Sequence, residues 1–275
     1  MPQESKLDFP ELHIIHPQDN QAHTHTAILL HGRASSGPEF AEDLFSSSTS
    51  TGKTLSACLP TWRWVFPTSR NRWSTSFQED MCAWFDVYSL NDITARQELQ
   101  VEGLRESVGY VLGIVEGEVE RLKGEGEDGR VFLGGMSQGM AMGLWTLFCA
   151  PGDAIRRWKL GGFLGMSGWL PFAGEVEERG RGQGRGKAAL GFFSKKISAS
   201  DSECDSDVLS TPVLLTHGTD DVWVSVDLGR QARRVLEETM GLSVEWEEFT
   251  GAENDGHWVK EPEGFDRILR FLERT

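Results

Sequence analysis

Short apolar runs typical of strands alternate along the chain with longer segments of helical periodicity. Seven runs predict strands, at residues 12–16, 26–31, 62–67, 130–135, 160–167, 211–218 and 243–249. Several of them are continuous apolar stretches, as expected for strands that are covered on both faces. The alternation predicts an α/β fold with a mostly parallel sheet flanked by helices, in which ligands bind beyond the carboxyl ends of the strands.

The longest predicted helix covers residues 94–123, where apolar side chains recur at steps of three and four. Thr94 and Gln97 have the spacing of a capping box at its start, and Gly124 stands where a C-terminal cap belongs. A glycine stripe runs along this segment at steps of four: Gly109, Gly113 and Gly117. We expect the glycine stripe to pack closely against a neighbouring element. Three further helices are predicted, at 138–150, 225–240 and 262–273.

The segment 172–210 differs in composition from the rest of the chain. Glycine, arginine, glutamate and serine dominate "GEVEERGRGQGRGKAALG" and "SASDSECDSD". This composition predicts a flexible surface insertion within a single domain of residues 1–275, with no large cap over the sheet. The arginine–glycine tract is similar to RNA-binding tracts, but one short copy on an acidic chain argues against that function.

The chain is acidic, with a formal net charge of −15 over 275 residues. A surface of this sign repels phosphate backbones and anionic lipids, which argues against nucleic acid and membranes as partners. The apolar runs are too short to span a bilayer, and the N-terminal residues lack the pattern of a signal peptide. The four cysteines are scattered, as in a protein with reduced thiols: Cys58, Cys82, Cys149 and Cys204. We therefore expect a cytoplasmic protein.

Several short motifs with chemical associations lack the context that their chemistry needs. The GxGxxG match at 124–129 is acidic, follows a predicted helix and precedes a strand, the reverse of a dinucleotide site. The "GKT" at 52–54 has Ser47 where a phosphate loop requires glycine. His23 and His25 have no cysteine or carboxylate at ligand spacing. We therefore expect neither a metal nor a cofactor.

The stretch "VFLGGMSQGM" (131–140) has the pattern of a nucleophile elbow. Gly135, Ser137 and Gly139 form GxSxG between a predicted strand and a predicted helix, which is the context this motif needs. Such a turn projects the serine hydroxyl from the sheet, and the helix N-terminus behind it favours developing negative charge. Ser167 in "GMSGW" also follows a strand but lacks the second glycine. Ser137 is therefore the candidate nucleophile.

A serine nucleophile needs a histidine base and a carboxylate that orients the histidine. On a fold of this kind the three occur in the order serine, acid, histidine. Asp220 and Asp221 both lie just past the predicted strand 211–218, in "THGTDDVWV". His257 lies in the loop after the last predicted strand and is the only histidine that follows His217. Spacing therefore identifies His257 as the base and leaves Asp220 and Asp221 as alternatives.

Several of these segments together resemble the acyl-protein thioesterase branch of the phospholipase/carboxylesterase family, whose members have the α/β-hydrolase fold. The resemblance is carried by "LLHGRASSG", "WFDVYSL", "GGMSQGMAMGLW", "THGTDDVWV" and a late "GH", and it extends with gaps from about residue 26 to the end. In the family pattern the aspartate of the triad is the third residue after "HG", with a valine three residues further on. The resemblance therefore implies Asp221, with Val224 as that valine.

The resemblance also implies an oxyanion hole made of two backbone N–H groups, those of Arg33 and Gln138. The family commonly has an apolar residue at the position of Arg33. The guanidinium of Arg33 is therefore expected either to face solvent or to favour a substrate that carries an anionic group.

Three residues are expected to bind substrate. Trp84 in "WFDVYSL" resembles the family's aromatic residue near the acyl site. Trp73 and Arg72 belong to the stretch 62–85, which is rich in tryptophan and arginine, and we expect them to wall the pocket.

Taken with the resemblance, these residues predict a serine hydrolase that cleaves carboxylic esters or thioesters through an acyl-enzyme. The expected substrates are small-molecule esters or acylated-protein thioesters. Two alternatives remain: a hydrolase of the esters or lactones of a specialised metabolite, and a non-catalytic binding protein on the same fold. The sequence does not predict an oligomeric state.

Overall fold

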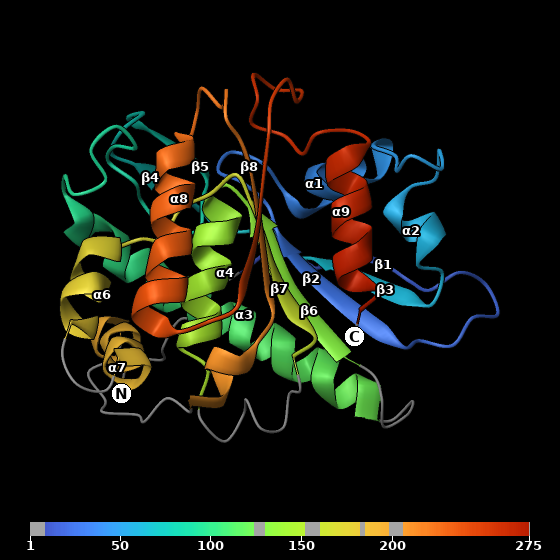
Figure 1. Ribbon diagram of the computed structural model, residues 1–275, viewed down its shortest axis with the longest axis horizontal. Helices are drawn as coiled ribbons and strands as arrows, with labels where there is room; N and C mark the ends of the chain where they lie inside the picture. The colour runs from blue at the N-terminus through green and yellow to red at the C-terminus, as the bar shows by residue number, and fades with distance from the viewer. Residues whose placement is uncertain (1–8, 124–129, 152–159, 182–184, 198–205, 275) are drawn as a thin grey trace.

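The computed structural model describes residues 9–123, 130–151, 160–181, 185–197 and 206–274. Its central sheet has seven strands in the order β1-β3-β2-β6-β7-β8-β9 (Figure 1). They are β1 (His13–Ile15), β2 (His25–Leu30), β3 (Trp62–Phe66), β6 (Arg130–Met136), β7 (Gly162–Met166), β8 (Val213–Gly218) and β9 (Val244–Phe249). The β1–β3 pair is antiparallel, and the other five neighbouring pairs are parallel. The seven predicted strands and the mostly parallel α/β fold are confirmed.

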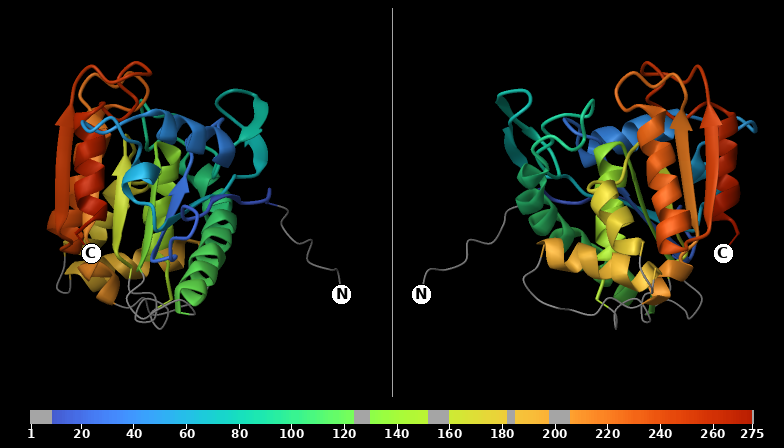
Figure 2. Two further views of the ribbon diagram at one scale, coloured as in Figure 1. Left: turned by 90° about the vertical axis from the view of Figure 1, so that its right-hand side faces the viewer. Right: turned by 60° about the vertical axis from the view of Figure 1, so that its left-hand side comes forward.

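Helices cover both faces of this sheet (Figure 1; Figure 2). One face carries α3 (Gln100–Lys123), α4 (Gln138–Phe148), α6 (Ala173–Gly180), α7 (Arg185–Ile197) and α8 (Val226–Arg234). The other carries α1 (Gly37–Ser46), α2 (Leu55–Cys58) and α9 (Glu263–Leu272). Strand β2 shows the resulting alternation, because Ile28 and Leu30 join the first core while Ala27 and Leu29 join the second. The continuous apolar runs of the sequence therefore correspond to strands buried on both faces.

The loops that follow the parallel strands gather at one end of the sheet, where Figure 2 also shows a separate hairpin. The hairpin consists of β4 (Asn71–Ser74) and β5 (Glu79–Cys82), which form a two-stranded sheet of their own. The sequence analysis did not predict it. Of the predicted helices, 138–150 corresponds to α4 and 262–273 to α9, and 225–240 to α8 followed by a π-helical turn, Val235–Met240.

Helix α3 differs from the prediction at its start and along its glycine stripe. The helix begins at Gln100 after a short 3₁₀ turn, and Thr94 donates a hydrogen bond to Asp92, so the expected capping box is wrong. Gly124, the expected C-terminal cap, lies outside the described residues. The glycine stripe faces open space, because a Cβ at any of its positions would have no atom within 4 Å. The close approach occurs instead at Gly103, where a Cβ would lie 2.6 Å from Phe85 Cα.

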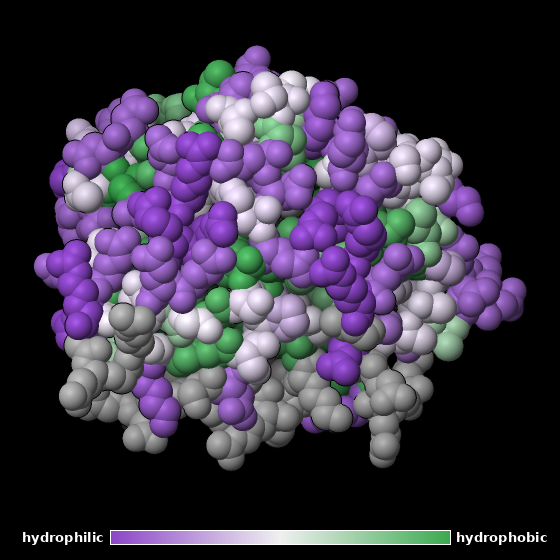
Figure 3. Space-filling model, in the orientation of Figure 1, coloured by the Kyte–Doolittle hydropathy of each residue, from purple (hydrophilic) through white to green (hydrophobic). Residues whose placement is uncertain are grey.

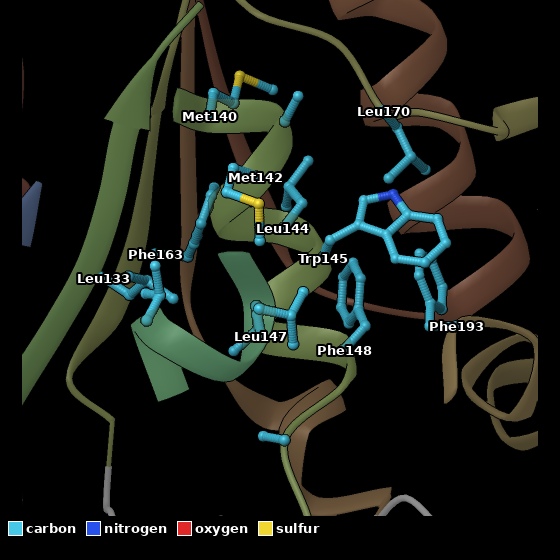
Figure 4. Packing of buried hydrophobic residues seen from close by; sticks show 14 of the residues in the cluster. Leu133, Met140, Met142, Leu144, Trp145, Leu147, Phe148, Phe163, Leu170 and Phe193 are labelled. Carbon is cyan, nitrogen blue, oxygen red and sulfur yellow. The ribbon is translucent and has the colours of Figure 1, made fainter. Parts of the chain in front are cut away.

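The described part of segment 172–210 packs into the core, whereas its composition predicted an insertion on the surface. It forms α6, α7 and a 3₁₀ turn, Ser206–Ser210, and its apolar side chains enter the main core. Phe193 of α7 is fully buried and packs against Trp145 and Phe148 of α4, with its ring centre 4.9 Å from each of theirs (Figure 4). Phe172 and Phe192 extend the same aromatic contact. These helices therefore belong to the layer that covers the sheet.

Hydrophilic side chains cover most of the molecular surface that is seen from the viewpoint of Figure 1 (Figure 3). Five large apolar side chains of the described residues are exposed: Trp73, Phe77, Tyr88, Val222 and Trp223. None of the helices in the described ranges has both the length and the apolar character needed to cross a bilayer.

Candidate active site

Ser137 lies on the turn that connects β6 to α4. Its φ of 56° and ψ of −121° lie in a region that a residue with a side chain rarely adopts, which stores about 1–3 kcal/mol of strain. The turn is tight, because a Cβ at Gly139 would lie 2.0 Å from the carbonyl oxygen of Leu30. Ser137 N–H donates to Met166 O at 2.8 Å, which fixes the turn to β7. The GxSxG pattern thus forms the strained strand–turn–helix geometry expected of it.

Asp221 and His257 meet although they come from two different loops. His257 Nδ1 lies 2.6 Å from Asp221 Oδ2, and the side chain of Asp221 is fully buried. Asp221 Oδ1 accepts hydrogen bonds from the N–H groups of Trp223 and Val224, each at 2.9 Å. Burial would raise the pKa of Asp221, but hydrogen bonds from His217, His257 and Val224 N–H outweigh it and hold this pKa well below its usual value. The carboxylate is therefore ionised and oriented toward His257.

Asp220 has a different position. It is exposed, and its Oδ2 accepts a hydrogen bond from Gly251 N–H at 2.9 Å. A Cβ at Gly256, next to His257, would lie 2.7 Å from the Asp220 carbonyl carbon, so the two loops are in close contact. Asp220 therefore connects the loops, and the geometry favours Asp221 as the partner of His257.

A second histidine contacts Asp221, and the sequence analysis did not identify it. His217 at the end of β8 is 1% exposed, and its Nε2 lies 2.8 Å from Val224 O and 3.4 Å from Asp221 Oδ2. The short distance to a carbonyl shows that Nε2 carries the proton. His217 therefore holds the loop in which Asp221 accepts its hydrogen bonds. The feature of the sequence that could have identified His217 is the "HG" at 217–218, which ends a predicted strand.

Ser137, Gln138 and His257 line one cavity of about 460 Å³. Most of its other lining residues are apolar, among them Phe40, Met136, Leu90, Trp169, Trp223 and Trp258. A cavity of this size and character suits an acyl chain or a small ester. Within the described residues no group of three or more His, Cys, Asp or Glu side chains is placed to hold a metal ion.

Arg33 and Gln138 both line this cavity beside Ser137. A Cβ on Gly32 would lie 3.4 Å from Ser137 Cβ, so the Gly32–Arg33 segment runs directly past the serine. Gln138 is held in place by its side chain, which donates to Phe85 O at 2.8 Å and accepts from Trp84 N–H at 2.9 Å. The two peptide N–H groups predicted for an oxyanion hole therefore belong to rigid segments next to Ser137.

His31 supports this segment from inside the protein. Its Nε2 accepts a hydrogen bond from Ser69 N–H at 2.9 Å, so the proton is on Nδ1, which donates to Gly32 O at 2.6 Å. Burial lowers the pKa of His31 to about 4, because the ring is fully enclosed. The imidazole is therefore neutral at physiological pH and fixes the turn that precedes Arg33.

None of the three residues expected to bind substrate lines the cavity. Trp84 is fully buried, and its Nε1 donates to His31 O at 2.8 Å, so it supports the site from below. Arg72 donates to Ala83 O and to Glu106, and Trp73 is 52% exposed on the outside of the hairpin. The hairpin contributes other residues to the cavity wall, namely Phe77, Glu79 and Met81.

The parallel sheet, the serine turn between β6 and α4, and the aspartate and histidine in the loops after β8 and β9 together define an α/β-hydrolase. Residues 11–188 match the model of the phospholipase/carboxylesterase family. The chain belongs to this family.

Relatives agree with this assignment, and solved structures agree with the fold. The chain is 26% identical to acyl-protein thioesterase 1 of Yarrowia lipolytica over 84% of both chains. It is 27% identical to carboxylesterase SOBER1 of Arabidopsis thaliana over 90% of this chain and 86% of that one. The crystal structure of SOBER1 superimposes with a TM-score of 0.64 at 25% identity, covering 91% of this chain and 98% of that one. For acyl-protein thioesterase 2 of Zea mays the TM-score is 0.65 at 23% identity, with 95% and 97% covered.

Proposed function

We propose that the protein is a serine esterase that hydrolyses carboxylic esters or thioesters through an acyl-enzyme. The observation that carries this proposal is the hydrogen bond of 2.6 Å between His257 Nδ1 and Asp221 Oδ2, beside a cavity that Ser137 and His257 both line. The relatives named acyl-protein thioesterase and carboxylesterase support the same class of reaction.

The proposed mechanism assigns one role to each group. His257 Nε2 takes the proton of Ser137 as the hydroxyl attacks the acyl carbon, and Asp221 stabilises the imidazolium that forms. The N–H groups of Arg33 and Gln138 bind the oxyanion of the tetrahedral intermediate. His257 then gives its proton to the leaving alkoxide or thiolate, which departs as the alcohol or thiol, and a water activated by His257 releases the acid from Ser137.

The substrates that we propose are small-molecule esters and acylated-protein thioesters. The apolar lining of the cavity supports an acyl chain as one occupant. A hydrolase of a specialised small metabolite is the second candidate, and the observation that favours it is the charged side chain of Arg33 in the cavity wall. We place the enzyme in the cytoplasm, where its free thiols Cys58 and Cys82 would stay reduced.

The proposal is tested by hydrolysis of p-nitrophenyl acetate and octanoate and by labelling with a fluorophosphonate. The wild type should hydrolyse the esters and be labelled by the fluorophosphonate. In Ser137→Ala, kcat should fall by about 10⁴-fold and no labelling should occur. Ser167→Ala is the matched control, because Ser167 also follows a Met at the end of a strand and also has a positive φ, 48°. It should label like the wild type. Labelling of Ser137→Ala, or no activity of the wild type on any ester or thioester, would refute the proposal.

A further inference from the structure

Arg33 belongs to the cavity wall, and its side chain is only partly exposed to solvent. Arg33 is partly buried, lines the cavity, and places its Cζ 4.5 Å from the centre of the Phe77 ring. Phe77 lines the same cavity from the β4–β5 hairpin. Stacking on a ring fixes the orientation of a guanidinium and leaves the N–H groups at its edge available to an anionic group such as a carboxylate.

Within the described residues no carboxylate forms an ion pair with Arg33. The charge of Asp86 acts on Arg33 from a distance, but Asp86 forms no ion pair with the guanidinium, and its two oxygens accept hydrogen bonds from Thr75. Asp43 and Glu79 also line the cavity, yet both are exposed, so water screens their charges. Burial lowers the pKa of Arg33, but a guanidinium remains charged in proteins. The cavity wall therefore contains a partly desolvated guanidinium that is not paired with any carboxylate of the described residues.

The position of Arg33 relative to the proposed chemistry defines where a counter-charge would bind. Its own backbone N–H is one of the two proposed donors to the oxyanion. The guanidinium consequently lies within one side-chain length of the carbonyl under attack. An anionic group can reach it when only a few bonds separate that group from the scissile bond.

We propose that Arg33 makes the enzyme selective for esters that carry a carboxylate close to the scissile bond, with the carboxylate bound by the guanidinium that Phe77 supports. This inference rests on the proposed hydrolase function and specifies its substrate class. A planar carboxylate matches the fork of N–H donors on arginine and would pair directly with the guanidinium. The carboxylate could belong to the acyl group or to the leaving group.

The experiment compares kcat/KM for two matched pairs of esters. The pair of 3-carboxy-4-nitrophenyl butyrate and 4-nitrophenyl butyrate tests a carboxylate on the leaving group. The pair of monoethyl adipate and ethyl hexanoate tests a carboxylate on the acyl chain, with release of ethanol as the readout. We expect the wild type to prefer the anionic member of one pair by about tenfold to a hundredfold, the range for one charge-assisted hydrogen bond.

Substitution of Arg33 should remove this preference. In Arg33→Gln the ratio of kcat/KM between the anionic and the neutral ester should fall to about one. Arg70→Gln is the matched control, since Arg70 also lies over a ring, 6.0 Å from the centre of Phe9, but pairs with Glu106 away from the cavity. It should keep the ratio of the wild type. Neutral esters preferred in both pairs by the wild type, or equal ratios in the wild type and Arg33→Gln, would overturn the inference.

A binding measurement separates this inference from the hydrolase function. Binding of monoethyl adipate and ethyl hexanoate to Ser137→Ala is followed by calorimetry, which needs no turnover. If Ser137→Ala binds the anionic ester more tightly than the neutral ester, and the double variant Ser137→Ala/Arg33→Gln does not, the result supports the anion site even if catalysis is absent. Equal binding of both esters refutes the anion site on the acyl side, and the same titration with the butyrate pair decides the leaving-group side.

Discussion

The hydrogen bonds of Asp221 predict the effect of replacing it by asparagine. In Asp221→Asn one of the two side-chain oxygens becomes an NH₂ group. The N–H groups of Trp223 and Val224 both point at Oδ1, 2.9 Å away, and require an acceptor there. The amide oxygen must therefore occupy the Oδ1 position, and the NH₂ must face His257 Nδ1, which is 2.6 Å from Oδ2 in the wild type.

A facing NH₂ group requires His257 Nδ1 to accept a hydrogen bond, so the imidazole proton moves to Nε2. This tautomer cannot take a proton from Ser137, and the imidazolium also loses the adjacent negative charge. We expect kcat for p-nitrophenyl esters to fall by about 10⁴-fold, equivalent to about 5 kcal/mol of transition-state stabilisation. The fold should persist, because the amide has the shape of the carboxylate.

The matched control is Asp220→Asn, at the neighbouring aspartate. Asp220 accepts one hydrogen bond, from Gly251 N–H, and does not contact His257. Its substitution should change kcat by less than about threefold, since exposed polar contacts contribute little. Steady-state kinetics and thermal unfolding of both variants test the argument. An Asp221→Asn enzyme within tenfold of the wild type, or a larger loss in Asp220→Asn, would show that the tautomer reasoning is wrong.

Three further predictions concern stability. In the folded protein the pKa of His31 is about 4, against an ordinary value near 6.5. The neutral ring therefore contributes up to about 3 kcal/mol to the free energy of unfolding above pH 6.5, and this contribution is lost as the pH falls toward 4. Urea unfolding across this range should show the loss, and His31→Gln should flatten the pH profile. Phe193→Ala should lower the free energy of unfolding by about 3–5 kcal/mol, whereas a loss below about 1 kcal/mol would contradict the packing of α7 on α4. Alanine at all three positions of the glycine stripe should raise the free energy of unfolding by about 2 kcal/mol. Gly103→Ala, whose new side chain collides with Phe85, should lower the free energy of unfolding. Chemical denaturation of both variants measures the contrast.

The strands and the serine turn were predictable because their signals are local. The inner strands of the sheet are short apolar runs with punctuating residues on either side, and burial on both faces makes these runs continuous. The GxSxG turn needs glycines where the backbones of β2 and α4 meet, because a side chain at Gly139 would collide with the carbonyl oxygen of Leu30. Order along the chain then restricted the base to His257.

The cavity wall could not be predicted in the same way. The hairpin strands Asn71–Ser74 and Glu79–Cys82 are mostly polar and exposed, so they lack the apolar alternation that marks a strand. Trp73, the large aromatic residue expected in the wall, points outward, whereas Phe77 in the hairpin turn reaches the cavity. Which aromatic side chain faces the site depends on how the hairpin packs, and composition carries no information about that packing.

Composition also misled the interpretation of segment 172–210 and of the glycine stripe. The glycine and arginine content of the segment obscured an apolar series at helical spacing that includes Leu190, Phe193 and Ile197. In α3 the apolar residues face the core, and the glycines occupy the other side, where no neighbour approaches. Small residues at regular steps indicate close packing only when the partner element is known.

The β4–β5 hairpin shares no strand pairing with the central sheet, and it reaches the rest of the protein partly through Arg72, which bonds Glu106 of α3. The groups proposed to perform the chemistry belong to the loops of the central sheet, whereas one wall of the cavity belongs to this separate hairpin. Part of the surface that contacts substrate thus comes from a different segment of the polypeptide than the groups proposed to perform the reaction. The hairpin could be exchanged for one of another length or composition, and the enzyme redirected to new esters while its catalytic groups stay in place.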